Sequence, residues 1–537
     1  MSVGVAAPAS ARSRVPAGLL AAAATVTALM ALPLAYLALR AGQASEGSWD
    51  LILRARTLWL ALRSVGLATA VTAATVVIGV PFAWLVIRTD LPLRRLWGVL
   101  GAMPLVFPSY VGAFALLAAL GPRGMLQGVL ESLIGVERIP DITGFPGAFL
   151  ALTLFTYPYV YLLTAAALRD LDPAMEDAAR TLGQSRWRTF LRVTLPLLRP
   201  SIAGGALLVG LYTLHDFGAV SLMRYQAFTQ AIYLQYRAAF DRTPAAILSL
   251  MLVVLALAVL VVEHRSRGRA RYHRMGSGTK PPLKPVALGQ WRWAALTFVA
   301  AVVLAALVLP LSVVVYWLLR GLSAGTTAGP TLGAAGNTVV AAGIGAVLAV
   351  AAGIPVATLA ARHRGAFASV AEKIAYSGYA LPGIVVGLAF VFFAAGLVPV
   401  LYQSLALLAL AYVVLFLPQA SEPLRAALLT VSPRIEEAGR VLGKRRLTIL
   451  LRIVLPLIGR GAIAGFALVF LTAMKELPAT LLLRPIEFET LSTRVWTAAS
   501  VGRYGAAAVP AVMLVVLAAV PTYILARRLE VQRVRPS

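Results

Sequence analysis

Long apolar runs separated by short polar loops constrain the fold of this chain more than any other feature. An α-helix of about 20 residues spans the hydrocarbon core of a membrane, and twelve runs have roughly that length or more. The chain is 60% hydrophobic and 13% charged, whereas soluble domains carry about 25% charged residues. We therefore predict an all-α polytopic membrane protein with about twelve transmembrane helices. The predicted spans lie near residues 17–39, 58–87, 97–120, 147–168, 197–222, 244–262, 292–319, 335–361, 374–396, 400–419, 461–483 and 505–526.

Two polar segments, residues 172–183 and 432–443, interrupt this apolar pattern 260 residues apart. Each begins with a good N-cap residue, Asp172 or Ser432, followed by Pro at the first helical position. Each ends at a glycine, which readily adopts the left-handed conformation that stops a helix. Both polar segments are therefore predicted to be short helices.

The polar segments belong to a duplication that extends along the chain. Gly79-Val80-Pro81 matches Gly353-Ile354-Pro355 at an offset of 274 residues, and Pro108 matches Pro382 at the same offset. The offset falls to 260 at the polar segments, so the 14 extra residues are placed in the loop around 121–146. With an even number of spans in each half, the two six-helix repeats are predicted to be parallel and related by an axis along the membrane normal.

The predicted organisation has three parts. Residues 1–263 form the first repeat with a polar loop at 172–196, residues 264–290 form a basic linker, and residues 291–537 form the second repeat with a polar loop at 432–456. Arginines are concentrated in the loops on one side of the predicted spans, which places that side and both termini in the cytoplasm. The same bias explains the net charge of +27 without nucleic-acid binding, because Lys and Arg lie in short loops between spans.

Residues suited to covalent or metal chemistry are scarce. The sequence has no Cys, and its four His residues offer little material for a transition-metal site. The stretch from Gly439 to Lys444 is one residue short of a phosphate-binding loop and lacks the final Ser or Thr, so ATP would have to bind to another protein. We predict no catalytic residue, no metal site and no cofactor, and do not expect an enzyme.

The polar segments resemble the EAA loop of ABC importer permeases. The resemblance is carried by Asp177-Ala178-Ala179 with Gly183 and by Glu437-Ala438-Gly439 with Gly443, each followed by Leu-Pro. Asp177 stands where the family usually has Glu, and Gly439 stands where it has the second Ala. The resemblance implies the fold of a type I importer permease, with coupling helices that dock in grooves on ATPase subunits. The implied coupling residues are Glu176, Asp177, Ala178, Ala179, Gly183, Glu436, Glu437, Ala438, Gly439 and Gly443.

Two polar patches, His215-Asp216 and Lys475-Glu476, follow the polar segments at matched positions. Acids at such a depth in a membrane are costly and usually face a cavity or a partner. One interpretation places both acids beside the translocation path, where they would attract a cation or close a gate. The gate would be held by pairing with His215, Lys475 or Arg484. The other interpretation treats the acids as structural charges at the external interface.

The stretches from His215 to Tyr236 and from Met474 to Leu481 are similar to the fused permeases of ferric iron importers. This resemblance implies import of ferric iron across a bacterial inner membrane, driven by two copies of a separate ABC ATPase subunit. It also implies an extracytoplasmic substrate-binding protein of the ferric-binding type. Fused permeases for thiamine or a phosphonate-type substrate share the doubled layout and remain alternatives. An ion-coupled secondary transporter is an alternative of another class, although it would carry ionised residues in mid-span and these spans are nearly free of charge.

Overall fold

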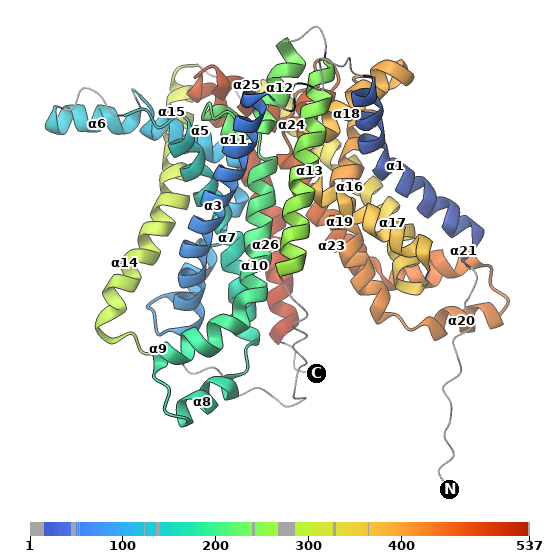
Figure 1. Cartoon of the computed structure of the whole chain (residues 1–537), viewed down its shortest axis with the longest axis horizontal. Coiled ribbons are helices and arrows are strands. Elements are labelled where there is room, and N and C mark those ends of the chain that lie inside the picture. The colour runs from blue at the N-terminus through green and yellow to red at the C-terminus, as the bar shows by residue number, and fades with distance from the viewer. Residues whose placement is uncertain are drawn as a thin grey trace.

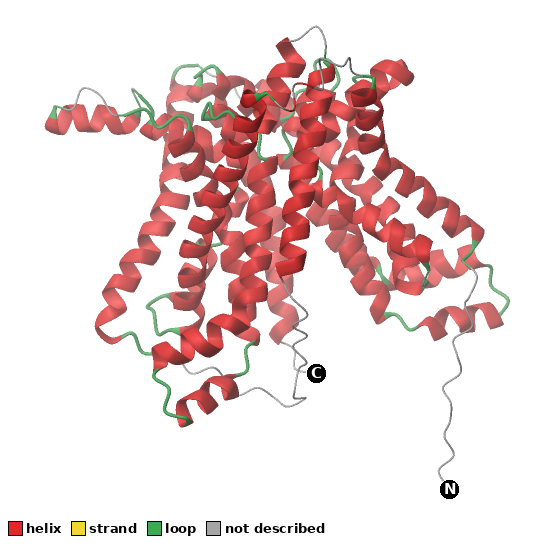
Figure 2. Ribbon diagram, in the orientation of Figure 1, coloured by secondary structure: helices red, strands yellow, loops and turns green. Residues whose placement is uncertain are grey.

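In a computed structural model of this chain, the described residues are 15–43, 50, 52, 54–122, 124–135, 140–238, 242–266, 285–325, 329–363 and 365–534. Their regular structure is helical (Figure 2), apart from one isolated bridge between Thr89 and Val286. Most of the predicted linker, residues 267–284, lies outside the described residues. The prediction of an all-α polytopic fold is confirmed.

The first half begins at α1 and ends at α13. Its elements are α1 (Ala17–Gly42), α3 (Ala55–Arg88), α4 (Arg94–Leu100), η1 (Met103–Val106), α5 (Ser109–Leu120), α6 (Met125–Ile134), α7 (Phe145–Asp170), α8 (Pro173–Thr181), α9 (Arg186–Thr189), η2 (Phe190–Thr194), α10 (Leu195–His215), α11 (Gly218–Leu222), α12 (Phe228–Ala238) and α13 (Thr243–Ser266).

The second half repeats this order without a counterpart of α6, the helix that occupies the predicted 14-residue excess. Its elements are η3 (Gly289–Trp291), α14 (Arg292–Val303), η4 (Leu304–Val308), α15 (Leu309–Ser323), α16 (Gly329–Arg362), α17 (Ala366–Tyr376), η5 (Ser377–Ala380), α18 (Gly383–Leu397), η6 (Pro399–Leu401), α19 (Leu405–Thr430), α20 (Pro433–Val441), α21 (Arg446–Ile449), η7 (Leu450–Val454), α22 (Leu455–Leu457), α23 (Gly459–Lys475), α24 (Pro478–Leu483), α25 (Leu491–Ser500) and α26 (Tyr504–Val534).

Nine helices among the described residues are long and apolar enough to cross a membrane. Two bent helix pairs are further candidates: Ala366–Ala380 with Gly383–Leu397, bent by 109°, and Leu450–Leu457 with Gly459–Met474, bent by 66°. The shorter apolar helix Tyr504–Ala519 coincides with the last predicted span. These candidates are consistent with the expected count of about twelve.

The third predicted span, 97–120, is broken rather than continuous. It divides into α4, the 3₁₀ turn η1 and α5, with Pro104 inside η1 and Pro108 just before α5. Proline lacks a backbone N–H and disfavours helical geometry in the residue before it, so a continuous helix is interrupted here. The N-terminus of α5 therefore begins in the interior of the protein.

The tenth span also differs from its prediction of 400–419, because α19 runs from Leu405 to Thr430. The helix continues through two internal prolines, which spanning helices tolerate when neighbours pack around them. Glu422 and Arg425 therefore lie inside a spanning helix, although the sequence analysis placed them beyond its end.

The two halves form lobes that are close together at one end and spread apart at the end that carries α8 and α20 (Figure 1). The first helix of each half packs against helices of the other half. The helix α1 packs against α16, α17 and α18, and α14 packs against α3 and α4. The end of the linker is fixed to the first half, because the N–H of Val286 donates to the carbonyl of Arg88 at 2.7 Å. The described ends of α1 and α26 lie on the side of α8 and α20 (Figure 1).

Three helices form the centre of each lobe: α3, α7 and α10 in the first half, and α16, α19 and α23 in the second. Small residues allow close approach between them. A Cβ atom on Gly79 of α3 would lie 3.0 Å from the Cβ of Val160 in α7, and one on Gly345 of α16 would lie 2.7 Å from the ring of Tyr412 in α19. Since α8 connects α7 to α10 and α20 connects α19 to α23, these cores set the positions of both short helices.

Candidate functional site

The two short helices predicted from the polar segments are α8 and α20, at the separated ends of the lobes (Figure 1). In α8 the carboxylate of Asp172 accepts a hydrogen bond from the N–H of Ala174 at 3.0 Å, as expected of an N-cap residue. Ser432 is the N-cap residue of α20 and has extended geometry, as predicted, but its side chain makes no capping hydrogen bond. The start of α20 is set instead by Pro433 at the first helical position.

Both short helices end next to the glycines at which the sequence predicted that they would end. Gly183 has φ +80° and Gly443 has φ +70°, conformations that favour glycine. Beyond them the N–H of Gln184 donates to the carbonyl of Ala179, and that of Lys444 donates to the carbonyl of Gly439, each at 3.1 Å. This bonding across a left-handed residue is a Schellman motif, and it turns the chain sharply into the next helix.

Glu176 and Glu436, two of the implied coupling residues, point toward the permease itself. Glu176 forms a buried ion pair with Arg88, the last residue of α3, and accepts a hydrogen bond from the hydroxyl of Thr194 at 2.8 Å. Glu436 pairs with Arg362, the last residue of α16, at 3.1 Å. The two carboxylates therefore hold the short helices to the ends of long spanning helices.

The second small residue of each motif also faces inward. Ala179 and Gly439 are buried, and a Cβ atom on Gly439 would lie 3.1 Å from Cγ1 of Ile449 in α21. Small side chains are thus needed here for packing between neighbouring helices of the same chain. These residues were implied coupling residues, and the sequence alone does not show that they face inward.

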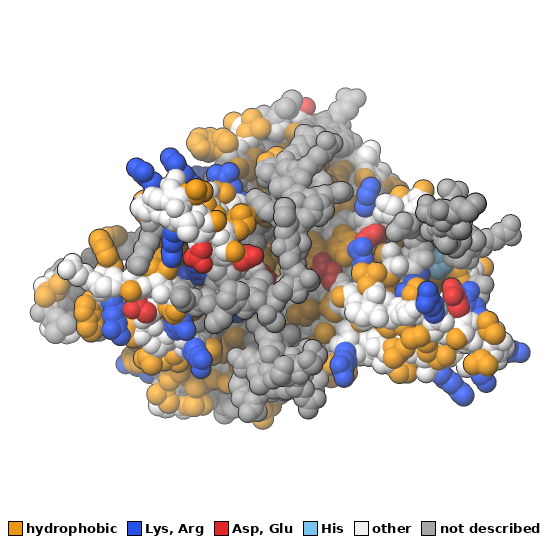
Figure 3. Space-filling view, turned by 90° about the horizontal axis from the view of Figure 1, so that it is seen from below, with side chains coloured by type: hydrophobic (Ala, Val, Ile, Leu, Met, Phe, Trp, Pro, Cys, Tyr) orange, Lys and Arg blue, Asp and Glu red, His pale blue; other side chains and the backbone are white. Residues whose placement is uncertain are grey.

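The outward faces of α8 and α20 carry the remaining motif residues, which are exposed: Asp177 and Ala178 in the first half, Glu437 and Ala438 in the second. Leu182 and Leu442, at the matched ends of the two helices, are 82% and 75% exposed. Figure 3 views this side of the molecule and shows hydrophobic and basic side chains over both lobes. Each short helix therefore offers an acid beside exposed apolar surface.

The sequence analysis missed the apolar part of this surface. Met175 and Ile435 are also exposed at matched positions near the helix starts. The sequence did contain a signal for this surface, because each polar segment has a large apolar residue at the same two matched positions. Large exposed apolar side chains grouped on a polar loop mark an interaction surface.

Asp216, from the first polar patch, is buried and caps a helix. Its Oδ1 accepts hydrogen bonds from the N–H groups of Ala219, at 2.8 Å, and Val220, at 3.2 Å, and its Oδ2 accepts one from the hydroxyl of Ser109. The carboxylate thus occupies the N-terminus of α11, where the helix dipole favours negative charge. Ser109 begins α5, so this contact also joins the broken third span to the fifth.

Glu476 caps α24 in the same way. It accepts hydrogen bonds from the N–H groups of Ala479 and Thr480, each at 2.9 Å, and from the hydroxyl of Thr480 at 2.7 Å. The residue that matches Ser109 is Gly383, and a Cβ atom there would lie 2.5 Å from Oε1 of Glu476. The longer acid therefore uses the space that the missing side chain leaves.

The cationic neighbours of these acids do not pair with them. Lys475 donates from Nζ to the carbonyl of Leu105 at 3.1 Å, a contact that joins the two halves. Nε2 of His215 is buried without a partner among the described residues, and Arg484 lies 4.0 Å from Glu489. The ion-paired gate considered from the sequence is therefore wrong in that detail.

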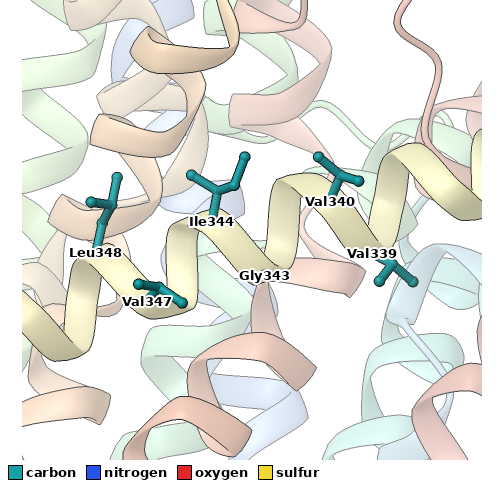
Figure 4. A pocket seen from close by; sticks show the side chains of 6 residues that line it. All are labelled: Val339, Val340, Gly343, Ile344, Val347 and Leu348. Atoms are coloured by element: carbon teal, nitrogen blue, oxygen red, sulfur yellow. The ribbon is translucent and has the colours of Figure 1, made fainter.

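The described residues offer no cluster that could hold a resident metal ion. Their His, Asp and Glu side chains form no group of three placed to hold a metal ion. A depression of about 400 Å³ lies along α16 (Figure 4), but its lining is entirely apolar. The lining residues are Val339, Val340, Gly343, Ile344, Val347 and Leu348.

The sequence model of the family described as binding-protein-dependent transport system inner membrane component matches this chain twice, at residues 75–271 and 353–535. The Fe(3+)-transport system permease protein FbpB 2 of Haemophilus influenzae is 32% identical to this chain over 501 residues. The aligned residues cover 92% of this chain and 95% of that protein. The ferric transport system permease protein FbpB of Actinobacillus pleuropneumoniae is 23% identical, over 85% of this chain and 69% of that protein.

A shorter relative matches one part of the chain. The molybdenum transport system permease protein ModB of Escherichia coli is 36% identical over 141 residues, which cover 26% of this chain and 60% of that protein.

The family model spans most of both halves, and its two matches each include one of the short helices α8 and α20. The chain therefore belongs to the binding-protein-dependent transport system inner membrane components, the multi-pass permease subunits of ABC importers, and is not an enzyme.

Proposed function

We propose that this chain is the fused permease of a ferric iron importer. The observation that carries the proposal is the alignment with the Haemophilus influenzae Fe(3+)-transport permease, which is continuous over 95% of that protein and includes both halves. Both proteins thus place two permease repeats in one chain. The proposed cargo is the substrate of transport, and no resident metal is required.

In the proposed mechanism, α8 and α20 dock on two copies of a separate ABC ATPase subunit. Each copy would contact exposed groups of one short helix, such as Asp177 and Leu182 of α8 or Glu437 and Leu442 of α20. ATP-driven closure of the ATPase pair would bring the two short helices together and rotate the lobes as rigid bodies. Alternating access of this kind exposes the path first to one side of the membrane and then to the other.

The two inward ion pairs support this transmission of movement. Arg88 and Arg362 are the last residues of α3 and α16, and each is paired with a glutamate of a short helix. Both long helices have 34 residues, a length of about 50 Å at 1.5 Å per residue. A displacement of α8 or α20 would therefore be transmitted along a helix that crosses the whole membrane.

We propose that the side bearing α8 and α20 is cytoplasmic, with both termini on that side, because the basic loops lie there. The opposite side would then receive substrate from an extracytoplasmic binding protein of the ferric-binding type. The division into repeats at residues 1–263 and 291–537, joined by a linker, remains part of this proposal.

A molybdenum-type substrate is the second candidate, because the ModB relative has a higher local identity of 36%. That match covers only one part of this chain, and for that reason we favour iron. Membership of the ABC permease family overturns the ion-coupled secondary transporter as an alternative.

The test is reconstitution of the permease with its cognate ATPase and binding protein in lipid vesicles. ATP hydrolysis and substrate uptake are measured with the binding protein loaded with ferric iron, molybdate, thiamine or a phosphonate. We expect ferric iron alone to stimulate both. Stimulation by molybdate in its place would discard iron, and the absence of an associated ATPase would contradict the coupling mechanism.

A further inference from the structure

Polar side chains form a continuous stripe in the membrane helices of the second half, which we call the polar ladder. They recur every three or four residues on four neighbouring elements, so those of each helix share a face. The ladder consists of Lys475 and Thr472 on α23, Gln419, Glu422 and Arg425 on α19, and Tyr379, Tyr376 and Glu372 on η5 and α17.

Members of the ladder on different helices interact with one another. The hydroxyl of Thr472 donates to Oε1 of Gln419 at 2.8 Å. Tyr379 and Glu422 lie close enough to interact. Below them Arg425 forms an ion pair with Glu372. The polar groups are therefore linked across α23, α19 and α17, and not scattered singly along one helix.

One end of the ladder lies at the contact between the two halves, and the other end lies near the side that carries α20. Its first member, Lys475, reaches across to the carbonyl of Leu105 in the first half. Its last members, Arg425 and Glu372, lie within about two turns of the ends of α19 and α17 that face α20. The ladder thus runs from the contact between the halves toward the proposed cytoplasmic side.

The charged members of the ladder are open to their surroundings. The side chains of Arg425 and Glu372 are 38% and 29% exposed, and Glu422 is also exposed. Ionised groups within spanning helices are costly against lipid and face water or protein. The exposure of these charges therefore favours water or protein, and not lipid, as the surroundings of the lower part of the ladder.

The first half has no such ladder, although its helices are arranged in the same way. The positions that match Glu422 and Arg425 are Leu162 and Ala165, and the position that matches Glu372 is Gly98. A requirement of the fold, or of the membrane interface at this depth, would apply to both halves. The ladder is therefore a property that only the second half has acquired.

We infer that the polar ladder is the wall along which the substrate leaves the membrane, and that Glu422 is a specificity-determining residue for a hard cation. Below Lys475 the ladder holds two acids, Glu372 and Glu422, and one base, Arg425, which forms an ion pair with Glu372. This part of the wall therefore carries one more acid than bases. Carboxylate oxygens suit hard cations, and weak, transient contacts allow release. This inference rests on the proposed function, because it takes the cargo to be ferric iron.

The test compares Glu422→Gln with Leu162→Gln, which places the same amide at the matched position of α7. Both variants are assembled with the cognate ATPase and binding protein, and initial rates of iron uptake and ATP hydrolysis are measured in vesicles. We expect Glu422→Gln to lower iron uptake at least fivefold with normal ATPase copurification. Leu162→Gln is expected to keep uptake within twofold of the unsubstituted complex.

A second variant guards against a failure of assembly. Tyr379→Phe removes only the hydroxyl of the tyrosine beside Glu422, and we expect it to lower iron uptake severalfold. Full uptake by an assembled Glu422→Gln complex, or by Tyr379→Phe if the former does not assemble, would overturn the inference and leave the proposed function intact. An unsubstituted complex that transports molybdate and not iron would overturn the proposed function, and with it the role of Glu422 toward a hard cation.

Discussion

The guanidinium of Arg88 and the carboxylate of Glu176 form an ion pair in which both side chains are less than 10% exposed. The matched pair in the second half, Arg362 with Glu436, is more exposed. Thr194 adds a hydrogen bond to Glu176, whereas the matched residue Val454 has no hydroxyl to donate. The short helix α8 is therefore held more firmly than α20, so the two proposed coupling contacts are not equivalent.

Glu176→Ala is expected to damage coupling more than Glu436→Ala. Removing one partner of a buried ion pair costs about 3 to 5 kcal/mol, whereas exposed pairs contribute about 1 kcal/mol or less. The ratio of transported substrate to hydrolysed ATP measures the effect, with copurification of the ATPase as the control for assembly. Equal losses in the two variants would contradict the inferred difference between α8 and α20.

Leu182→Asp and Leu442→Asp are expected to weaken docking of the ATPase while the permease still inserts. Each substitution removes an exposed apolar side chain from the end of a short helix and adds a charge to surface that docking would bury. A loss of about 2 kcal/mol per site would weaken the association roughly 30-fold. Copurification from detergent measures it. Val501→Asp, at an exposed apolar position in the turn between α25 and α26, is the control, and a similar loss there would refute a specific docking surface.

The caps of α11 and α24 predict a rescue experiment. Gly383→Ser places a Cβ atom against Glu476, and we expect it to destabilise the protein by about 1 to 3 kcal/mol, as overpacking does. The double variant Gly383→Ser/Glu476→Asp recreates the pair that Ser109 and Asp216 form in the first half. It should recover most of the loss in thermal unfolding of the solubilised protein. A double variant that melts below the single variant would show that the two pairs are not interchangeable.

Lys475→Met is expected to raise ATP hydrolysis in the absence of loaded binding protein. The substitution removes the hydrogen bond from Lys475 to Leu105, which joins the halves in the conformation seen here. A hydrogen bond from a charged donor contributes about 1.5 to 3 kcal/mol, enough to shift a two-state equilibrium about tenfold or more. His215→Met at the matched position is the control, because Nε2 of His215 makes no bond that could be lost. Unchanged basal hydrolysis in Lys475→Met would argue against a gating role for this contact.

Local sequence signals predicted the short helices well. Proline at the first position and glycine after the last fix where α8 and α20 begin and end, because both residues act through their own backbone geometry. The inward and outward faces could not be assigned in the same way. Glu176 and Asp177 are adjacent acids, and only the position of Arg88, 88 residues earlier, distinguishes the acid that faces the protein.

Predictions that depended on packing were less successful. Apolar content alone made 97–120 a single span, although Pro104 and Pro108 divide it. The end of α19 was placed too early because Glu422 and Arg425 were taken as loop residues, whereas partners on α17 and a polar environment keep them helical. A hydropathy pattern records preference for lipid or water, and it contains no information on which helix faces another.

The exchange of first helices has a consequence for synthesis of the chain. The helix α1 is made first, but α16, which it packs against, begins roughly 290 residues later, and its neighbours α17 and α18 follow α16. At about 5 to 20 residues per second, α1 would remain without these neighbours for roughly 15 to 60 s. During that interval its exposed flank must be tolerated by lipid or by the insertion machinery. Completion of either lobe therefore depends on the other, and the linker ensures that both arrive in the same membrane and in equal number.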